Sequence, residues 1–443
     1  MSTVNVAPKD VKESLAKHVL ADGYDMTLDM EKSQGVYLHD SKYGRDMLDF
    51  FTCFASMPIG YNHPKMTGDK AFQKDLMLAA MTNPSNSDIY TTQYADFVET
   101  FARVGIPDYL PHAFFVAGGG LAIENALKVA MDWKVQKNYA AGHTKEKGHK
   151  VIHFEQAFHG RTGYTLSLTN TLPEKTKWFA KFDWPRVSNP HIKFPYTDAS
   201  YEDLKKREEL CFSQIENAFK ENPDDICAIL IEPVQSEGGD FHFRNEFFEK
   251  LRAICDEKDC LLIYDEVQTG VALSGKFWLH EHFGENARPD IIAFGKKMQV
   301  CGILAGGKVD EVETNCFNVS SRINSTWGGN LVDMVRSKRI LEIIAEDDLV
   351  EHAAKMGEYL NDHLVGLSEK FPAVTSVRHK GLVAAFDLPT GEARDAIISK
   401  GMEMNVMFLG SGDKTIRFRP SLIIQKEDID KGMVVLATIL KGM

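Results

Sequence analysis

The chain has 443 residues, of which 44% are hydrophobic and 26% charged, an ordinary composition for a globular protein of two or three domains. Its formal net charge of −12 argues against a nucleic-acid-binding protein, which would carry a basic face. No apolar run approaches the length of a membrane span, and the first twenty residues contain acids where a secretory signal would have an apolar core. We therefore expect a cytoplasmic protein with no membrane or nucleic-acid partner.

The cysteines point to a reducing compartment. There are seven, an odd number, and no two of them form a CxxC pair. This pattern favours free thiols over a disulfide framework or a structural zinc site, so no metal ion is expected.

The N-terminal segment differs in pattern from the middle of the chain. A short amphipathic helix is expected over residues 9–21 and a small hairpin over Gly35–Phe51. From about residue 66 to 320, strand and helix signals alternate, which implies βαβ crossovers and a mostly parallel sheet. The expected strands are Ala113–Ala117, Val151–Phe154, Cys227–Glu232, Leu261–Asp265, Ile291–Phe294 and Gly302–Gly306. The expected helices are Ala122–Tyr139, Tyr201–Phe219 and Asn245–Glu257.

The pattern changes past about residue 325. The expected helices are Leu331–Ile344, Leu349–Glu369, Gly391–Met402 and one that begins at Lys426, and the expected strands lie in residues 381–389, 405–410 and 415–424. The fold class is therefore α/β, with a mostly parallel central sheet in a large domain over 66–325. A smaller α+β domain is expected over 326–443, joined by the N-terminal segment over 1–65.

Two of the expected strands end in residues of opposite charge. Leu261–Asp265 ends in an acid, and 31 residues beyond that acid the next strand leads through Gly295 to Lys296. Open α/β sheets bind ligands at the carboxyl ends of their strands. A carboxylate and an amine there suit pyridoxal phosphate, which needs an anion at its pyridinium nitrogen and a lysine for its Schiff base. A structural arginine is the alternative partner for Asp265.

The lysine is one of two neighbours. Lys296 and Lys297 are adjacent and point in different directions, so only one of them can bind a cofactor. Gly295 leaves room beside Lys296, which is therefore preferred, with a pair of surface lysines as the alternative. Burial and nearby positive charge would lower the pKa of the amine and make it nucleophilic. Gln268, three residues past Asp265, could donate to the cofactor's phenolate oxygen.

A strand also runs into three glycines, Gly118, Gly119 and Gly120, and then into a helix. A helix N-terminus presents free N–H groups, and glycine lets a phosphate approach them. The motif lacks the GK[ST] ending of a Walker loop and the GxGxxG spacing of a dinucleotide loop. The motif is therefore consistent with two interpretations, a phosphate site and a plain strand-to-helix turn.

Further candidates follow other strands. Phe158 could lie flat on a cofactor ring and Arg161 could bind a carboxylate, although a core residue and a surface ion pair are the alternatives. Glu237 is either a site residue or a helix cap. Arg417 and Arg419 alternate onto one strand face, so one of them could reach a substrate carboxylate.

Taken in this order, the motifs resemble the class III (ω-amino acid) aminotransferases among the fold type I pyridoxal-phosphate enzymes. The resemblance covers nearly the whole chain, from DFFTCFASMPIGYNHP to RFRPSLI. Within the family it is strongest to the group that acts on the ε-amine of L-lysine. The segments that carry it are GGGLAIENALKVAMDWK, FHGRTGYTLSLTNT, EGGDFHFRNEFF, AFGKKMQVCGI and RINSTWGGN. The chain has three glycines where the family usually has Ser-Gly-Thr, so backbone amides must hold more of the phosphate.

The resemblance implies a role for each matching residue. Lys296 would form the Schiff base and carry a proton between the substrate carbon and the cofactor, while Asp265 would pair with the pyridinium nitrogen. Thr326 would reach the phosphate of the neighbouring subunit, which predicts a homodimer with shared active sites. The other implied cofactor contacts are the phenolate donor Gln268, the stacking ring of Phe158, and the N–H groups of Gly119 and Gly120.

The implied substrates are L-lysine and 2-oxoglutarate. Arg161 would hold the lysine carboxylate, and Arg417 the 2-oxoglutarate carboxylate beside the reacting carbon, with Gln268 next to them. Glu237 would neutralise Arg417 while lysine is bound and swing away for the second half-reaction. The expected reaction is ping-pong transfer of the ε-amino group, giving 2-aminoadipate 6-semialdehyde and L-glutamate.

Three alternatives remain at this point. Another ω-aminotransferase, for ornithine, acetylornithine or 4-aminobutyrate, would use the same residues, because one methylene is worth only roughly 1–3 kcal/mol in a pocket. An aminomutase or decarboxylase would not need the dicarboxylate site at Arg417. A binding or scaffold protein would not need Lys296.

Overall fold

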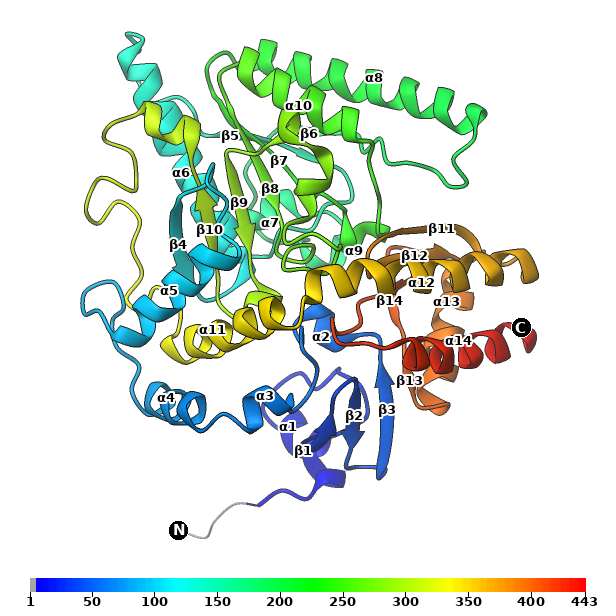
Figure 1. Cartoon of the computed structure of the whole chain (residues 1–443). Coiled ribbons are helices and arrows are strands. Elements are labelled where there is room, and N and C mark those ends of the chain that lie inside the picture. Colours follow the sequence, from blue (N-terminus) through cyan, green and yellow to red (C-terminus); the bar gives the residue numbers. More distant parts are fainter. Residues whose placement is uncertain (1–4) are drawn as a thin grey trace.

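A seven-stranded sheet forms the centre of the molecule, whose computed structural model describes residues 5–443 (Figure 1). The strand order is β4-β10-β9-β8-β7-β5-β6, and all neighbours are parallel except β10, which is antiparallel to both β4 and β9. The expected α/β fold with a mostly parallel sheet is therefore confirmed. The strands are β4 (His112–Val116), β5 (Lys150–Phe154), β6 (Arg186–Val187), β7 (Ile226–Ile231), β8 (Leu261–Asp265), β9 (Ile291–Phe294) and β10 (Cys301–Ala305).

Both faces of this sheet are buried, as the unbroken apolar sequence of its strands requires. On β8, Leu262 and Tyr264 join the core that contains helix α10 (Asn245–Glu257), whereas Leu261 and Ile263 join the core that contains helix α6 (Gly119–Ala140). Asp265 follows in the register of Leu261 and Ile263, on the α6 side. Because α6 begins at the carboxyl edge of the sheet, this alternation directs the acid toward the N-terminus of α6.

The chain from residue 64 to 239 contains six further α-helices besides α6. They are α3 (Pro64–Thr67), α4 (Lys70–Met81), α5 (Thr92–Val104), α7 (Thr165–Leu168), α8 (Asp198–Glu221) and α9 (Ser236–Gly239). α8 begins three residues before the expected Tyr201, because Thr197 and Ser200 form a reciprocal capping box at its start.

A second sheet joins the two ends of the chain. Its order is β1-β2-β3-β13, and β13 pairs in parallel with β3, with Val406 opposite Leu48. The expected hairpin over 35–51 is confirmed as β2 and β3, and β1 is an additional strand. The bounds are β1 (Leu28–Gln34), β2 (Tyr37–Asp40), β3 (Arg45–Asp49) and β13 (Val406–Met407).

The C-terminal region adds an antiparallel sheet, β11-β12-β15-β14, beside its helices. The strand expected over 405–410 is in fact two, since the chain leaves the N-terminal sheet after β13 and enters this one as β14. The bounds are β11 (Thr375–Lys380), β12 (Val383–Asp387), β14 (Leu409–Ser411), β15 (Thr415–Phe418), α11 (Leu331–Glu346), α12 (Leu349–Lys370), α13 (Gly391–Glu403) and α14 (Lys426–Lys441).

Two expected elements are shorter than predicted. The strand over 415–424 ends at Phe418, because Pro420 cannot donate a hydrogen bond to a sheet. The helix over 9–21 is a 3₁₀ turn, Pro8–Asp10, followed by α1 (Val11–Ala16), and none of its residues is buried, so no packing supports a longer helix. Across residues 5–443 no helix combines the length and apolar character needed to cross a bilayer.

Candidate active site

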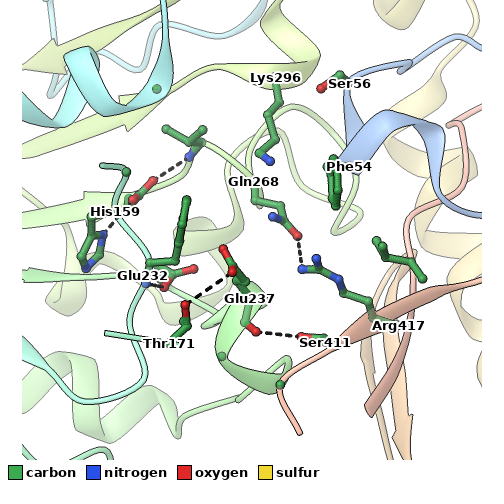
Figure 2. Close-up of a pocket in the computed structure, with 18 of the residues that line it drawn as sticks. Phe54, Ser56, His159, Thr171, Glu232, Glu237, Gln268, Lys296, Ser411 and Arg417 are labelled. Atoms are coloured by element: carbon green, nitrogen blue, oxygen red, sulfur yellow. Dashed lines mark hydrogen bonds and ion pairs between the residues drawn. The ribbon is translucent and has the colours of Figure 1, made fainter. Parts of the chain in front are cut away.

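A cavity of about 1210 Å³ opens at the carboxyl edge of the central sheet. Its walls come from the ends of β4 and β8, the start of α6, the C-terminal strands β14 and β15, and an N-terminal segment that includes Phe54 and Ser56. The N-terminal, central and C-terminal parts of the chain therefore all contribute to one site (Figure 2).

The structure brings nine of the ten sequence-predicted site residues to this cavity. They are Gly119, Gly120, Phe158, Arg161, Glu237, Asp265, Gln268, Lys296 and Arg417. Thr326 is the exception, since its side chain is exposed and lies outside the cavity of its own chain.

Lys296 and Lys297 have different surroundings. Lys296 lines the cavity, and burial, followed by the charge of Arg417, lowers the pKa of its amine to about 8. Lys297 is buried away from the cavity, where its Nζ donates to the backbone oxygen of Gln268 at 2.6 Å. Lys296 is therefore the lysine that can meet a ligand, with an amine that loses its proton easily.

Asp265 is buried and hydrogen-bonded to a histidine. His159 Nδ1 donates to Asp265 Oδ2 at 2.8 Å, and the backbone N–H of Val267 donates to Oδ1 at 3.1 Å. The partner in the protein is thus a histidine and not the structural arginine considered from the sequence. His159 was missed as a site residue, although its position next to Phe158 in the same motif was a usable signal.

Glu232, which directly follows β7, is a second buried acid and was not among the predicted site residues. Its Oε1 accepts the backbone N–H of Phe158 at 2.9 Å, and its Oε2 accepts that of Ser236 at 3.1 Å. Burial is the main cause that raises its pKa to about 7. The carboxyl group therefore joins the loop of Phe158 to the turn that carries Glu237.

The start of α6 has the features of a phosphate site. Gly118 has a φ of 117°, which only glycine adopts readily, and the helix begins at the next residue. A Cβ on Gly119 would lie 2.9 Å from a methyl group of Val267, and one on Gly160 would lie 2.7 Å from the Cα of Gly120. The glycines thus allow close backbone packing around free helix N–H groups, which bind anions.

Gln268 is held by two arginines. Its Oε1 accepts from an Nη atom of Arg417 at 2.9 Å and from Nε of Arg419 at 3.3 Å. Because the oxygen is taken, the Nε2 donor is the end of the amide that is free to serve a ligand. This orientation supports the predicted donor role of Gln268. Arg419, which also pairs with Asp240, is a support that the sequence analysis left unassigned.

Arg417 is a buried cation without a carboxylate partner. It is 3% exposed, and burial, followed by the charge of Arg419, lowers its pKa to about 10. It donates to the side-chain oxygen of Gln268 and to the backbone oxygen of Ser236, and over residues 5–443 no acid pairs with it. An incoming carboxylate would therefore be bound strongly at this position.

Glu237 does not occupy that position. Its Oε1 forms an ion pair with Lys175 and accepts a hydrogen bond from Thr171 Oγ1 at 3.4 Å. The predicted contact of Glu237 with Arg417 is absent from this structure, in which Glu237 pairs with Lys175 instead. The movement of Glu237 between Arg417 and a second position therefore stays a prediction. The structure contains the state in which Glu237 is away from Arg417.

An unusual turn carries Phe54 into the cavity. Four consecutive non-glycine residues, Thr52 to Ala55, have positive φ, a backbone conformation that is unfavourable for L-residues. Asp49 holds the turn by accepting the N–H groups of Phe51 and Thr52, each at 2.8 Å. The Phe54 ring centre then lies 5.7 Å from the Nζ of Lys296. No periodicity in the sequence predicts such a turn.

These groups fit pyridoxal phosphate. A buried carboxylate, a reactive lysine, a glycine-lined helix N-terminus and an aromatic ring line one cavity, and they match the ring nitrogen, aldehyde, phosphate and ring face of that cofactor. When bound, the cofactor supplies an electron sink for the carbon that carries the transferred amine.

The comparison with protein families agrees with this chemistry. The model described as aminotransferase class-III matches residues 19–440. The L-lysine-epsilon aminotransferase of Mycobacterium tuberculosis is 49% identical over 434 residues, which is 98% of this chain and 96% of that protein. The protein of the same name from Streptomyces clavuligerus is 44% identical over 439 residues, with coverage of 98% and 94%.

Solved structures give the same result. The lysine aminotransferase from M. tuberculosis in the internal aldimine form superposes with a TM-score of 0.96, at 48% identity, over 99% of this chain and 100% of that one. A transaminase from the marine bacterium Virgibacillus reaches a TM-score of 0.83 at 21% identity, over 98% of each chain, which shows a shared fold.

Proposed function

Because the chain belongs to the class III aminotransferases, we propose that it transfers the ε-amino group of L-lysine to 2-oxoglutarate. The products are 2-aminoadipate 6-semialdehyde and L-glutamate, formed in two half-reactions on pyridoxal 5′-phosphate. The observation that carries the proposal is the full-length similarity, at 44–49% identity, to proteins named for L-lysine. The cavity supports it with two arginines that have no acid partner over residues 5–443, Arg161 and Arg417.

The proposed chemistry assigns each group at the reacting carbon one task. Lys296 holds the proton that leaves the substrate carbon and returns it on the cofactor side, which its lowered pKa favours. Asp265 provides the anion at the pyridinium nitrogen, and His159 fixes the orientation of that carboxylate. Gln268 donates from its Nε2 to the phenolate oxygen, because its Oε1 is held by arginines.

The two substrates place different demands on the arginines. Lysine brings one carboxylate, far from its reacting amine, and Arg161 binds it. 2-Oxoglutarate brings two carboxylates, of which Arg417 binds the one beside the reacting carbon and Arg161 the other. Glu237 neutralises Arg417 only in the first case. Phe158 stacks on the cofactor ring, and its backbone N–H is fixed by Glu232.

The phosphate site is proposed to be completed across a homodimer. The N–H groups of Gly119 and Gly120 bind the phosphate from one chain, and Thr326 reaches it from the other. Support comes from exposed apolar side chains near Thr326, namely Trp327, Ile89 and Tyr90, since such patches mark interfaces. The two segments pack together, because Ser87 Oγ donates to the backbone oxygen of Ser325 at 2.5 Å.

The donor is tested with a panel of amines. Purified holoenzyme is given L-lysine, L-ornithine, N-acetylornithine or 4-aminobutyrate together with 2-oxoglutarate, and the glutamate formed is measured. We expect the largest kcat/KM for lysine, and Lys296→Ala should form no glutamate with any donor. A higher kcat/KM for ornithine or 4-aminobutyrate would refute the proposed donor. The cytoplasmic location stays a prediction, supported by seven cysteines that are all unpaired.

A further inference from the structure

Lys175 lines the cavity, although no sequence motif predicted a functional residue at this position. It ends the turn Pro173–Lys175, and its Nζ forms the ion pair with Glu237 Oε1. The same Nζ lies 3.5 Å from Thr171 Oγ1 and 5.3 Å from the ring centre of Phe158. The Lys175 and Glu237 side chains are only 23% and 25% exposed, so water screens the pair incompletely.

Glu237 forms an ion pair with only one of three cations that line the cavity. Lys175, Arg161 and Arg417 line the same cavity, and burial, followed by the charges of the two arginines, lowers the pKa of Lys175. Among the described residues neither arginine has a carboxylate partner, while Glu237 is paired with Lys175. In this structure Arg417 is therefore free to bind a carboxylate, and Glu237 is held by Lys175.

The backbone of Glu237 is fixed, which leaves only its side chain to move. Arg417 donates to the backbone oxygen of Ser236 at 3.0 Å, and the N–H of Gly412 donates to the backbone oxygen of Glu237 at 3.0 Å. Glu237 thus starts one residue from the carbonyl that Arg417 binds, and Figure 2 shows it between Thr171 and Arg417. Because the backbone is held, rotation about its side-chain bonds is the motion left to the Glu237 carboxylate.

We propose that Lys175 is the docking partner that holds Glu237 away from Arg417 while a 2-oxo acid carboxylate occupies Arg417. The inference rests on the proposed function, in which Arg417 must be neutralised with lysine and free with 2-oxoglutarate. The Glu237 carboxylate needs a cation in each of its two positions. Arg417 is the cation in the first position, and Lys175 is the cation in the second. Lys175 is a positioning residue, because stabilising the open state raises the affinity for ligands that require it.

The test separates the two half-reactions in the holoenzyme. Lys175→Gln removes the charge and keeps the length of the side chain. The apparent dissociation constants of glutamate, and of 2-oxoglutarate with the aminated enzyme, should rise about tenfold, as is typical when one of two contacting charges is removed. The limiting rates should stay within about twofold, and so should the lysine half-reaction, which uses the other position of Glu237. Lys175→Arg should restore the affinity.

The matched control is Lys177→Gln, in the same loop. Lys177 is exposed, pairs with Glu174 at 3.5 Å and does not line the cavity, so its loss should leave both half-reactions unchanged. Thermal unfolding of each variant shows whether it folds.

The same Lys175 substitution in a Glu237→Gln enzyme distinguishes an effect through Glu237 from direct substrate binding. In Glu237→Gln there is no carboxylate to hold, so Lys175→Gln should have no further effect on glutamate or 2-oxoglutarate. A tenfold loss that persists in that background, or an equal loss for lysine, would overturn the proposal and assign Lys175 to direct substrate binding. Failure of the proposed donor appears separately, as a wild-type enzyme that does not use lysine, because the Lys175 comparison is made with glutamate and 2-oxoglutarate.

Discussion

Lys296 and Lys297 are neighbours in the chain, yet their amines meet different surroundings. Lys296 lines a cavity that contains Arg417, and both burial and that charge favour its neutral form. Lys297 is held in the interior by the backbone of Gln268. At the scale of single residues, environment decides function, and the same holds for Asp265, which a histidine orients, and for Glu232, which burial makes easier to protonate.

The pKa of Lys296 predicts how cofactor uptake depends on pH. A neutral amine is required for attack, and the fraction that is neutral rises with pH until the pKa of about 8 is passed. The rate at which cofactor-free enzyme takes up pyridoxal phosphate should therefore rise about tenfold per pH unit below that value and level off above it. Stopped-flow absorbance from pH 6 to about 10 measures this, with Lys296→Ala as the control. A rate that still climbs between about pH 9 and 10 would indicate an ordinary lysine.

The left-handed turn from Thr52 to Ala55 shows how a short element can be imposed from outside. Its conformation is unfavourable for each residue, and it persists because Asp49 binds its first N–H groups and Thr52 Oγ1 donates to the backbone oxygen of Arg419. The turn holds Phe54 beside Lys296. It contacts residues more than 350 positions away in the chain, which explains why local sequence did not reveal it.

A glycine in this turn should behave unlike a glycine elsewhere. Cys53 is exposed and has a φ of 51°, so Cys53→Gly should be neutral or stabilising, whereas Cys53→Val should destabilise the protein by about 1–2 kcal/mol. As a control, Lys355→Gly at an exposed site inside α12 should cost about 1 kcal/mol. The free energy of unfolding in urea measures all three. If Cys53→Gly costs as much as Lys355→Gly, the turn is not left-handed in solution.

At the scale of the molecule, three parts of the chain contribute residues to the candidate active site. The central sheet brings Asp265 and Lys296 to one edge, the C-terminal sheet brings Arg417, and the N-terminal segment brings Phe54. The parallel pairing of β13 with β3 ties the two ends of the chain together. Thr326 is exposed and does not line the cavity of its own chain, as expected of a residue that serves a partner subunit.

Shared active sites can be detected by mixing two chains that each lack one residue of the site. If Thr326 acts in the neighbouring subunit, a heterodimer of Lys296→Ala and Thr326→Ala chains contains one site with both residues intact. We expect Thr326→Ala alone to weaken cofactor binding about tenfold or more and Lys296→Ala alone to be inactive, since a lost hydrogen bond to a charged group is costly. Co-expressed, tag-purified heterodimers should recover about half of the wild-type activity per dimer, when assayed at a cofactor concentration that loads the wild type but not Thr326→Ala. No recovery would show that each chain uses its own Thr326.

The sequence by itself determined six of the seven strands of the central sheet, their mostly parallel pairing and most of the residues that line the candidate site. Apolar strands that alternate with helices predict a parallel sheet, and in such a sheet an acid or lysine at a strand end must emerge at the ligand-binding edge. This is why Asp265, Lys296 and the glycines before α6 could be found from local patterns. The helices of the C-terminal region were also located closely, because their apolar periodicity is long and regular.

Only the tertiary structure decided which groups hold these residues in place. The hydrogen bond from His159 to Asp265, the binding of Gln268 by two arginines, and the pairing of Glu237 with Lys175 all join segments that are distant in sequence. Such contacts depend on how whole elements pack, and they leave no periodic trace in the chain. The sequence therefore placed the acid and the lysine, and the fold decided which charges surround them.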